Sequence, residues 1–273
     1  MRKKRYQTEL ASLVCAVVGV FLLVPSVAVA QSDGYRAPRT AEGTPDLNGI
    51  WQAINTAHWD IEPHGASQGT TRELGALNAM PGGLGVVEGD VIPYRPEALE
   101  QRNDNFANRV ARDPAIKCYL PGVPRAMYMP HPFQIIQSTD HIMIVHEFAG
   151  AVRTVYMQDH VPAPAPSWMG WSNGRWEGDT LVIETTGFNG MTWFDRSGNF
   201  HSDGLRVVER ISARSPETLN YEVAIEDPEV FTRSWTMHMP LYRRVEANAE
   251  LMEFRCVEFV EDLMYGHLRK QPD

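Results

Sequence analysis

The stretch TLNYEVAIED, residues 218–227, decides the fold because its polarity changes at every second residue. In a β-strand successive side chains point to opposite faces, so this alternation gives the strand one apolar and one polar face. The apolar face carries Leu219, Tyr221, Val223 and Ile225, and the other face carries Asn220, Glu222, Ala224 and Glu226. Such a strand is typical of an antiparallel sheet that covers a core on one side and meets water on the other.

Seven further runs after residue 130 have a similar β-branched and aromatic character, and turn residues separate them. They are FQIIQS (133–138), HIMIVHEF (141–148), AVRTVYM (151–157), TLVIET (180–185), LRVVERISA (205–213), VFTRSWTMHM (230–239) and ELMEFRCVE (250–258). A short strand is also expected at Gly49-Ile50-Trp51. Because the connections are tight, the sequence predicts an all-β fold, an antiparallel meander that closes into a lipocalin-like barrel. Such a barrel can hold one small ligand, and a two-sheet sandwich is the alternative.

The region before these strands is expected to be irregular apart from one helix. Residues 31–45 are polar and contain two prolines, which predicts an extended lead-in. Residues 46–273 are expected to form a single β-barrel domain, with an insertion of loops and a helix at about 55–130. The helix is predicted to start at Pro96 and to end before Pro114. One face of this helix is expected to carry Leu99, Arg102, Phe106 and Val110.

The N-terminus has the three parts of a secretory signal peptide. Residues 2–5 are basic, residues 13–23 are apolar, and Ala28-Val29-Ala30 matches a small-x-small cleavage site. We therefore expect residues 1–30 to be removed and the mature chain to be periplasmic or secreted, without a membrane partner. An uncleaved membrane anchor is the weaker alternative, because the apolar segment is shorter than the ~20 residues that span a bilayer and Pro25 interrupts it.

The charge of the chain argues against nucleic acid as a partner. The full chain has a formal net charge of −9, and removal of residues 1–30 leaves 21 basic and 33 acidic residues, a net charge of −12. An acidic chain without a cluster of lysine or arginine has no surface suited to phosphate backbones or anionic lipid.

Two of the three cysteines, Cys118 and Cys256, would remain after export. In an oxidising compartment such a distant pair is expected to form a disulfide rather than a reactive thiol couple. The bond would tie the middle of the chain to its last predicted strand. Closing so long a loop would stabilise the fold by roughly 4–5 kcal/mol in the chain-entropy description.

The stretch NGRWEGDTLVIET, residues 173–185, contains charged residues that are either chemical groups or parts of a sheet corner. Ser172-Asn173-Gly174 is predicted as a turn, and Gly178-Asp179 as a two-residue hairpin connection after a short strand. Arg175 and Glu177 lie two residues apart and therefore project on one face. We expect a sheet corner with paired, solvated charges.

A succession of motifs gives the chain a resemblance to a known family. The motifs are C-x-x-P-G-x-P-R (Cys118–Arg125), Glu147 followed by Arg153, S-W-M-G-x-S-x-G-R-W-E-G-D-T-L-V (Ser167–Val182), T-T-G-F-N (Thr185–Asn189) with Thr192-Trp193, H-S-x-x-L-x-V-x-E-R (His201–Arg210) and Glu226-Asp227-Pro228. Over nearly all of residues 113–258 the chain resembles a widespread family of secreted, functionally uncharacterised bacterial proteins. The resemblance implies export and brings no reaction with it.

His201 and Glu209 are the first candidate catalytic residues. Glu209 interrupts an apolar strand, and a carboxylate buried there needs a partner or a raised pKa, which suits acid/base chemistry together with His201. The structural alternative is a salt bridge inside the barrel to Arg153, Arg210 or Arg255. We predict that Glu209 faces the interior and matters more for function than Glu177 or Asp179, which flank a glycine turn.

Glu147 and Arg153 form a second candidate catalytic pair across a predicted turn. A two-residue turn at Ala149-Gly150 would place His146 opposite Arg153, whereas a three-residue loop that includes Ala151 would place Glu147 there instead. The spacing leaves both open. Either arrangement suits a ligand carboxylate or a stabilised hairpin.

Aromatic residues near the predicted loops indicate a ligand-binding opening. We expect Trp168, Trp171 and Trp193 to line one barrel mouth with His201, and Tyr156 to contribute to the same ligand site. Indole rings stack well on flat or apolar ligands.

Metal and cofactor motifs do not enter the prediction. The nine histidines include no H-x-H or H-E-x-x-H spacing, and Rossmann and phosphate-loop motifs do not occur. We expect no metal, no cofactor, no G-x-S-x-G nucleophile elbow and therefore no covalent hydrolase chemistry. Two functions stay open. One is an exported barrel that binds a small amphipathic or aromatic molecule and transforms it by acid/base chemistry as a lyase, hydratase or isomerase. The other is a non-enzymatic periplasmic ligand carrier or envelope structural protein.

Overall fold

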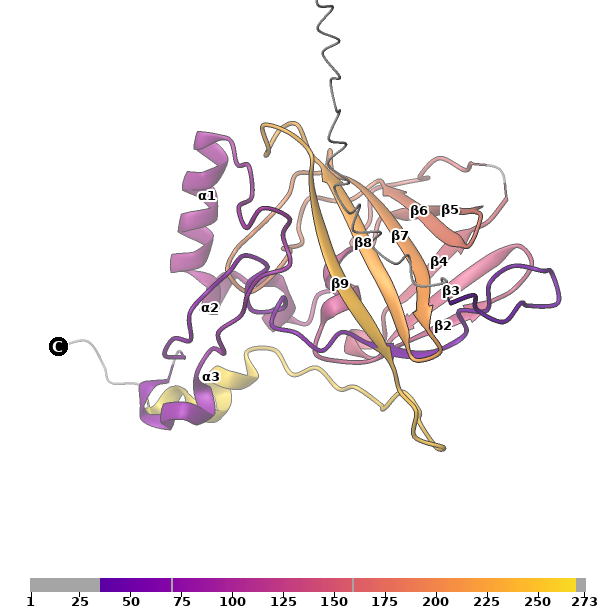
Figure 1. The fold of residues 1–273 in the computed structure, drawn as a ribbon. Coiled ribbons are helices and arrows are strands. Elements are labelled where there is room, and N and C mark those ends of the chain that lie inside the picture. Colours follow the sequence, from indigo (N-terminus) through magenta and orange to yellow (C-terminus); the bar gives the residue numbers. More distant parts are fainter. Residues whose placement is uncertain (1–34, 70, 159, 269–273) are drawn as a thin grey trace, which may run out of the picture. The chain divides into compact units, whose positions relative to one another are not determined.

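The computed structural model describes residues 35–69, 71–158 and 160–268, so the predicted signal peptide lies outside the described residues. In this part of the chain nine strands form a closed barrel, and neighbouring strands follow their order in the sequence (Figure 1). The strands are β1 (Gly49–Gln52), β2 (Phe133–Gln137), β3 (His141–His146), β4 (Val152–Tyr156), β5 (Trp171–Glu177), β6 (Thr180–Thr186), β7 (Arg206–Ser215), β8 (Thr218–Glu226) and β9 (Trp235–Arg243). The α-helices are α1 (Pro96–Ala107), α2 (Arg109–Arg112) and α3 (Val260–Tyr265).

Pairing of the first strand with the last closes the barrel. β1 pairs with β2 on one side and with β9 on the other, so that Trp51 has Phe133 and Arg243 as its strand partners. This closure confirms the predicted all-β barrel and excludes the two-sheet sandwich. Across the described residues, no helix combines the length and the apolar character that a membrane crossing requires.

The pairing of β4 with β5 differs from a strict antiparallel meander. These strands run parallel, with Val155 opposite Ser172 and Tyr156 opposite Asn173. Gly174 allows β5 to pack closely against the end of β4, since a Cβ atom at that position would lie 2.5 Å from Sδ of Met157 and 2.6 Å from Cγ1 of Val155. The predicted turn at residues 172–174 is therefore wrong, and these residues form the first half of a strand.

The remaining strand predictions differ from the structure mainly near the C-terminus. The two-residue connection at Gly178-Asp179 is confirmed, with Glu177 opposite Thr180 and Gly178 in the left-handed region. The predicted strand at 250–258 is wrong. β9 already pairs with both β8 and β1, so no strand edge is left for this segment to join.

Helix α1 starts at Pro96 as predicted, but the predicted apolar face is wrong. Leu99 is 45% exposed and Phe106 is 37% exposed, whereas Ala98 and Asn105 are the buried residues of the helix. The helix is held by a polar contact, in which Nδ2 of Asn105 donates to the carbonyl oxygen of Gly198 at 3.2 Å. Small and polar residues therefore make the contact that the sequence pattern assigned to large apolar ones.

Inward-facing side chains fill the barrel. In β8 the predicted apolar face is confirmed, because its four apolar residues are buried. The other strands contribute Phe133, Ile135, Ile142, Ile144, Val155, Leu181, Ile183, Val207, Ile211, Met237 and Leu241 to the same core. Each large apolar side chain that is buried in this way stabilises the fold by about 1.5–3 kcal/mol relative to exposure.

Candidate functional site

Arg153 and Glu209 form an ion pair inside the barrel. Glu209 is 0% exposed and Arg153 is 3% exposed. Nη1 of Arg153 donates to Oε1 of Glu209 at 3.0 Å, and Nη2 of Arg153 donates to Oε2 of the same carboxylate. The structure thus places Glu209 in the interior and selects Arg153 as its partner among the three candidate arginines.

The rest of this pair's hydrogen-bonding capacity is also used. Nε of Arg153 donates to Oγ of Ser172 at 2.8 Å, and Nη2 donates to Oγ1 of Thr185 at 2.7 Å. Oη of Tyr221 donates to Oε1 of Glu209 at 2.9 Å, and burial raises the pKa of Tyr221 well above 10. A buried charge pair in which every nitrogen and oxygen atom has a partner holds strands together and is sealed from a substrate.

Ser172 belongs to this interior cluster although its sequence context suggests a hydrolase. The residues GWSNG (170–174) match the G-x-S-x-G pattern of nucleophile elbows, so the expectation that no such pattern occurs is wrong. A nucleophile elbow needs an exposed serine on a tight turn between a strand and a helix. Ser172 instead lies within β5 and is buried, with Arg153 and Thr185 as partners. The pattern therefore carries no nucleophile here.

The turn between β3 and β4 separates Glu147 from Arg153. Arg153 is opposite Ile144, and the chain between the strands makes a 3-10 turn (Phe148–Gly150) in which Ala149 has a φ of 57°. Neither predicted turn occurs. Glu147 lies outside the barrel, where Oε1 is 3.1 Å from Nδ1 of His131.

His146 is a buried neutral histidine next to the interior cluster. Burial, followed by the nearby charge of Arg153, lowers the pKa of His146 to about 3. In the described part of the chain neither ring nitrogen makes a well-formed hydrogen bond. The imidazole therefore stays neutral over the physiological pH range.

His201 does not join Glu209. Its Nε2 lies 2.6 Å from Oγ1 of Thr192, and its Nδ1 lies 2.7 Å from the carbonyl oxygen of Ser202. The hydroxyl of Ser202 bonds instead to Asp227 at 2.9 Å, so these residues form no catalytic triad. Burial lowers the pKa of His201, and its contacts hold the loop before β7 in place.

The predicted aromatic mouth does not form as one site. The ring of Trp168 stacks on Tyr119 at 4.7 Å between centroids, and the ring of Trp171 stacks on Tyr156 at 4.5 Å. Trp171 alternates with the inward-facing Ser172 and so projects from the outer face of the barrel. Trp193 is buried beside the loop of His201. The expectation of a single mouth with these side chains is corrected to three separate settings.

A cavity of 270 Å³ lies beside the barrel, between the insertion before β2 and the C-terminal segment. Its apolar walls include Ile116, Met129, Phe148, Phe254, Val257 and Val260. Its polar lining includes His58, His131, Arg196 and Glu261. Mostly apolar walls with a few polar groups are the usual composition of a ligand pocket.

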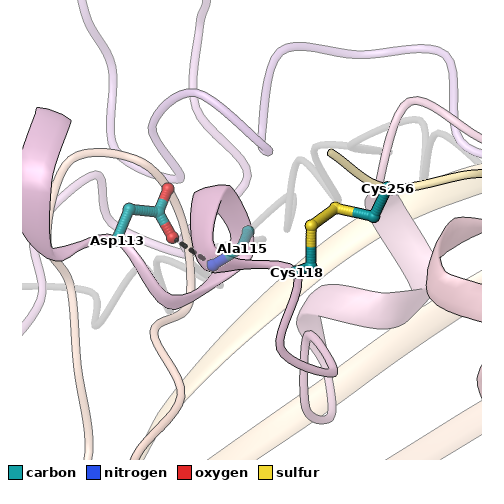
Figure 2. Close-up of a disulfide and its surroundings, with 4 residues drawn as sticks. All are labelled: Asp113, Ala115, Cys118 and Cys256. Atoms are coloured by element: carbon teal, nitrogen blue, oxygen red, sulfur yellow. Dashed lines mark hydrogen bonds between the residues drawn. A yellow bond between two sulfur atoms is a disulfide. The ribbon is translucent and has the colours of Figure 1, made fainter. Parts of the chain in front are cut away.

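The C-terminal wall of the cavity is attached covalently. The predicted disulfide between Cys118 and Cys256 is confirmed, as Figure 2 shows. The Cα atoms of the two cysteines are 5.7 Å apart. Just before Cys118, Oδ1 of Asp113 accepts from the backbone N–H of Ala115 at 2.9 Å and so starts the short 3-10 turn that presents the cysteine (Figure 2). The bond joins a loop to an irregular segment and not to a strand.

Three further contacts hold the same wall. The backbone N–H of Phe259 donates to the carbonyl oxygen of Ile116 at 2.9 Å. Oε2 of Glu147 accepts from the backbone N–H of Met252 at 2.8 Å, so one carboxylate binds both the wall and His131. Nη1 of Arg196 donates to Oε1 of Glu261 at 3.0 Å.

Two histidines at the cavity differ in their partners. His131 is partly exposed, its Nδ1 faces Glu147, and its ring contacts Phe148 and Phe254. His58 is only 9% exposed, and its Nδ1 has no hydrogen-bond partner among the described residues. Burial, followed by the charges of Arg125 and Arg196, lowers the pKa of His58 well below 6.5, so its ring is neutral.

Sequence reasoning singled out Cys256 of the cavity lining and Glu147, which contacts the lining residue His131, and missed both histidines. The walls come from segments far apart in the sequence, and no local pattern marks His58 or His131 as neighbours. The one signal that pointed to the place was the predicted Cys118–Cys256 bond, which brings the C-terminal segment to the insertion.

Comparison of the sequence with known protein families and with curated proteins gave no match. The resemblance to a family of secreted proteins therefore stays a prediction. Over residues 35–69, 71–158 and 160–268, no group of three or more His, Cys, Asp or Glu side chains is placed to hold a metal ion.

Proposed function

We propose that this protein binds a small, largely apolar molecule in the 270 Å³ cavity beside the barrel. The observation that carries the proposal is a set of apolar walls interrupted by a few polar groups. Ligand pockets usually measure about 300–1,000 Å³, so this cavity suits a small ligand with one ring system or a short chain.

The barrel interior supports this choice of site by contrast. Lipocalin-like barrels can hold a ligand inside, but here Arg153, Glu209 and Tyr221 occupy the interior and bond to one another. A ligand that entered would have to break a satisfied buried charge pair. Binding in the cavity beside the barrel would leave this charge pair intact.

Acid/base turnover of the bound molecule is a second proposal, and the pair His131 and Glu147 favours it. A carboxylate at Nδ1 fixes the tautomer of an imidazole and leaves Nε2 free to accept a proton. Glu147 takes this position, and His131 lines the cavity. A carrier of the same fold would bind the same molecule and release it unchanged.

The variant His131→Gln separates an enzyme from a carrier. An enzyme loses conversion of the bound molecule in this variant and keeps its affinity within about threefold. If the wild type and the variant both release the molecule unchanged, the protein is a carrier. Mass spectrometry of the small molecules after incubation gives the readout.

We further propose that the mature protein works in the periplasm or outside the cell, without a nucleic acid or membrane partner. The signal-peptide pattern of residues 1–30 supports export. The disulfide supports it independently, because disulfides are rare in reducing compartments.

Native mass spectrometry of protein purified gently from the cells that make it tests the binding proposal. We expect a retained small molecule in the wild type. Ala115 lines the cavity, so Ala115→Phe fills it and is expected to abolish retention. Ala111→Phe is the matched control, because Ala111 is exposed on the adjacent helix α2. Equal retention by both variants would place the ligand elsewhere.

A further inference from the structure

The buried ring of His58 marks one end of the cavity as a hydrogen-bonding position. Buried polar atoms in folded proteins nearly always have a partner, and an unpartnered one costs about 1–3 kcal/mol. His58 lines the cavity, and its Nδ1 is buried without a partner in the described part of the chain. Because this atom has almost no accessible surface, a ligand in the cavity reaches it only after a small turn of the ring.

The charges around the cavity restrict the chemistry of that partner. Arg196 lines the cavity, but it already binds Glu261 at 3.0 Å and lies 4.0 Å from Asp113. Asp113 in turn forms a buried pair with Arg125 at 2.9 Å. Arg255, the other arginine of the lining, is exposed and pairs with Glu253. Each arginine of the cavity lining in the described part of the chain thus has a carboxylate partner, which disfavours a second carboxylate as the ligand.

A cationic group is also disfavoured at His58. Burial and, after it, the charges of Arg125 and Arg196 already oppose a positive charge at this ring, and a cationic ligand would meet the same opposition. A neutral polar group is therefore the best partner. A hydroxyl suits it in particular, because a hydroxyl donates and accepts and so matches either tautomer of the imidazole.

Aromatic walls add the last constraint. Phe148 and Phe254 lie with ring centroids 4.9 Å apart, and His131 contacts both rings. Rings in such a cluster favour another ring in edge or offset contact.

We propose that the ligand is a neutral aromatic alcohol of the phenol type, with its hydroxyl on Nδ1 of His58 and its ring between the aromatic walls. This inference rests on the proposed binding function and names the ligand class for the same cavity.

The test compares two probes of the same shape, 2-naphthol and 2-methylnaphthalene, by isothermal titration at pH 7. One hydrogen bond to a neutral group contributes about 0.5–1.5 kcal/mol, so wild-type protein should bind 2-naphthol about threefold to tenfold more tightly. His58→Phe keeps a ring and removes the nitrogen, so this variant should bind the two probes about equally. His58→Asn keeps a polar atom near the position of Nδ1 and should retain part of the preference.

The outcomes separate the two proposals. Equal binding of both probes by folded wild-type protein overturns the hydroxyl assignment and leaves the binding function in place. A preference that persists in His58→Phe also overturns it. Tighter binding of 2-naphthoate than of 2-naphthol would show a carboxylate site and overturn the neutral ligand class. Binding of none of the three probes to wild type counts against the cavity itself.

Discussion

The polar cluster inside the barrel and the polar groups around the cavity are in opposite hydrogen-bonding states. Inside, Arg153 and Glu209 use their capacity on each other and on neighbouring strands. At the cavity, Nδ1 of His58 has no partner among the described residues, and Nδ1 of His131 faces Glu147. The difference teaches that a buried charge in a strand need not mark an active site. Polar atoms left for a ligand are the better guide.

The largest effect is expected from Glu209→Gln, which leaves Arg153 charged and without a carboxylate in the barrel. Breaking a buried ion pair by changing one partner costs about 3–5 kcal/mol. Urea unfolding measures the loss. Glu177→Gln is the matched control, since Glu177 pairs with Arg175 and Arg210 on the exposed face and should change stability little. Equal losses in the two variants would contradict a structural interior cluster.

Removal of the disulfide should have the next largest effect. Cys118→Ser with Cys256→Ser releases the C-terminal wall, and we expect a loss of about 2–4 kcal/mol in unfolding free energy. Ligand binding should weaken together with stability, because Cys256 lines the cavity. Non-reducing peptide mapping of the exported wild type checks that the bond forms. Unchanged ligand affinity in the double variant would argue that the wall does not need its covalent attachment.

Stability should fall with acidity in part because of His146. The folded pKa of His146 is about 3, below the usual 6.5, so the unfolded chain binds a proton first as the pH drops. The contribution of neutral His146 to the free energy of unfolding is fully present above pH 6.5 and is lost as the pH falls toward 3. At pH 5 the loss amounts to about 2 kcal/mol. Burial raises the pKa of Asp195 to about 7, so this group instead adds stability as the pH falls. Its effect is the same in the wild type and in a His146 variant. Unfolding of wild type and His146→Gln at pH 7 and pH 5 isolates the histidine, and parallel losses would contradict its burial.

The smallest effect concerns the aromatic residues. Phe148→Leu should weaken ligand binding about threefold to tenfold, because an aromatic contact contributes about 0.5–1.5 kcal/mol beyond its buried area. Trp171→Leu should change affinity less than twofold, because Trp171 stacks on Tyr156 outside the barrel. Titration with 2-naphthol measures both. A larger loss of affinity in Trp171→Leu than in Phe148→Leu would indicate that the ligand binds at the aromatic site predicted from the sequence.

The barrel could be predicted from the sequence because its signals are local. The alternation in residues 218–227 defines a face within one strand, and Glu209 is conspicuous among apolar neighbours. β5 was harder, because the glycine in its first half suggested a turn and only packing against Met157 explains it. The segment 250–258 has the composition of a strand but meets a sheet that is already closed.

The cavity could not be predicted in the same way. His58 is brought to the C-terminal segment only by the tertiary fold, and nothing beside it in the sequence indicates a partner. The prediction of an apolar face on helix α1 was wrong for a related reason, because Asn105 and not Phe106 makes the buried contact.

The most direct test of the central claim is an NMR titration of isotope-labelled protein with 2-naphthol. The account predicts that amide signals of Ile116, Phe148 and Val257 at the cavity shift with saturation. Signals of Val207 and Val223 inside the barrel should stay in place. Saturable shifts confined to the barrel interior, with the cavity signals unchanged, would contradict it.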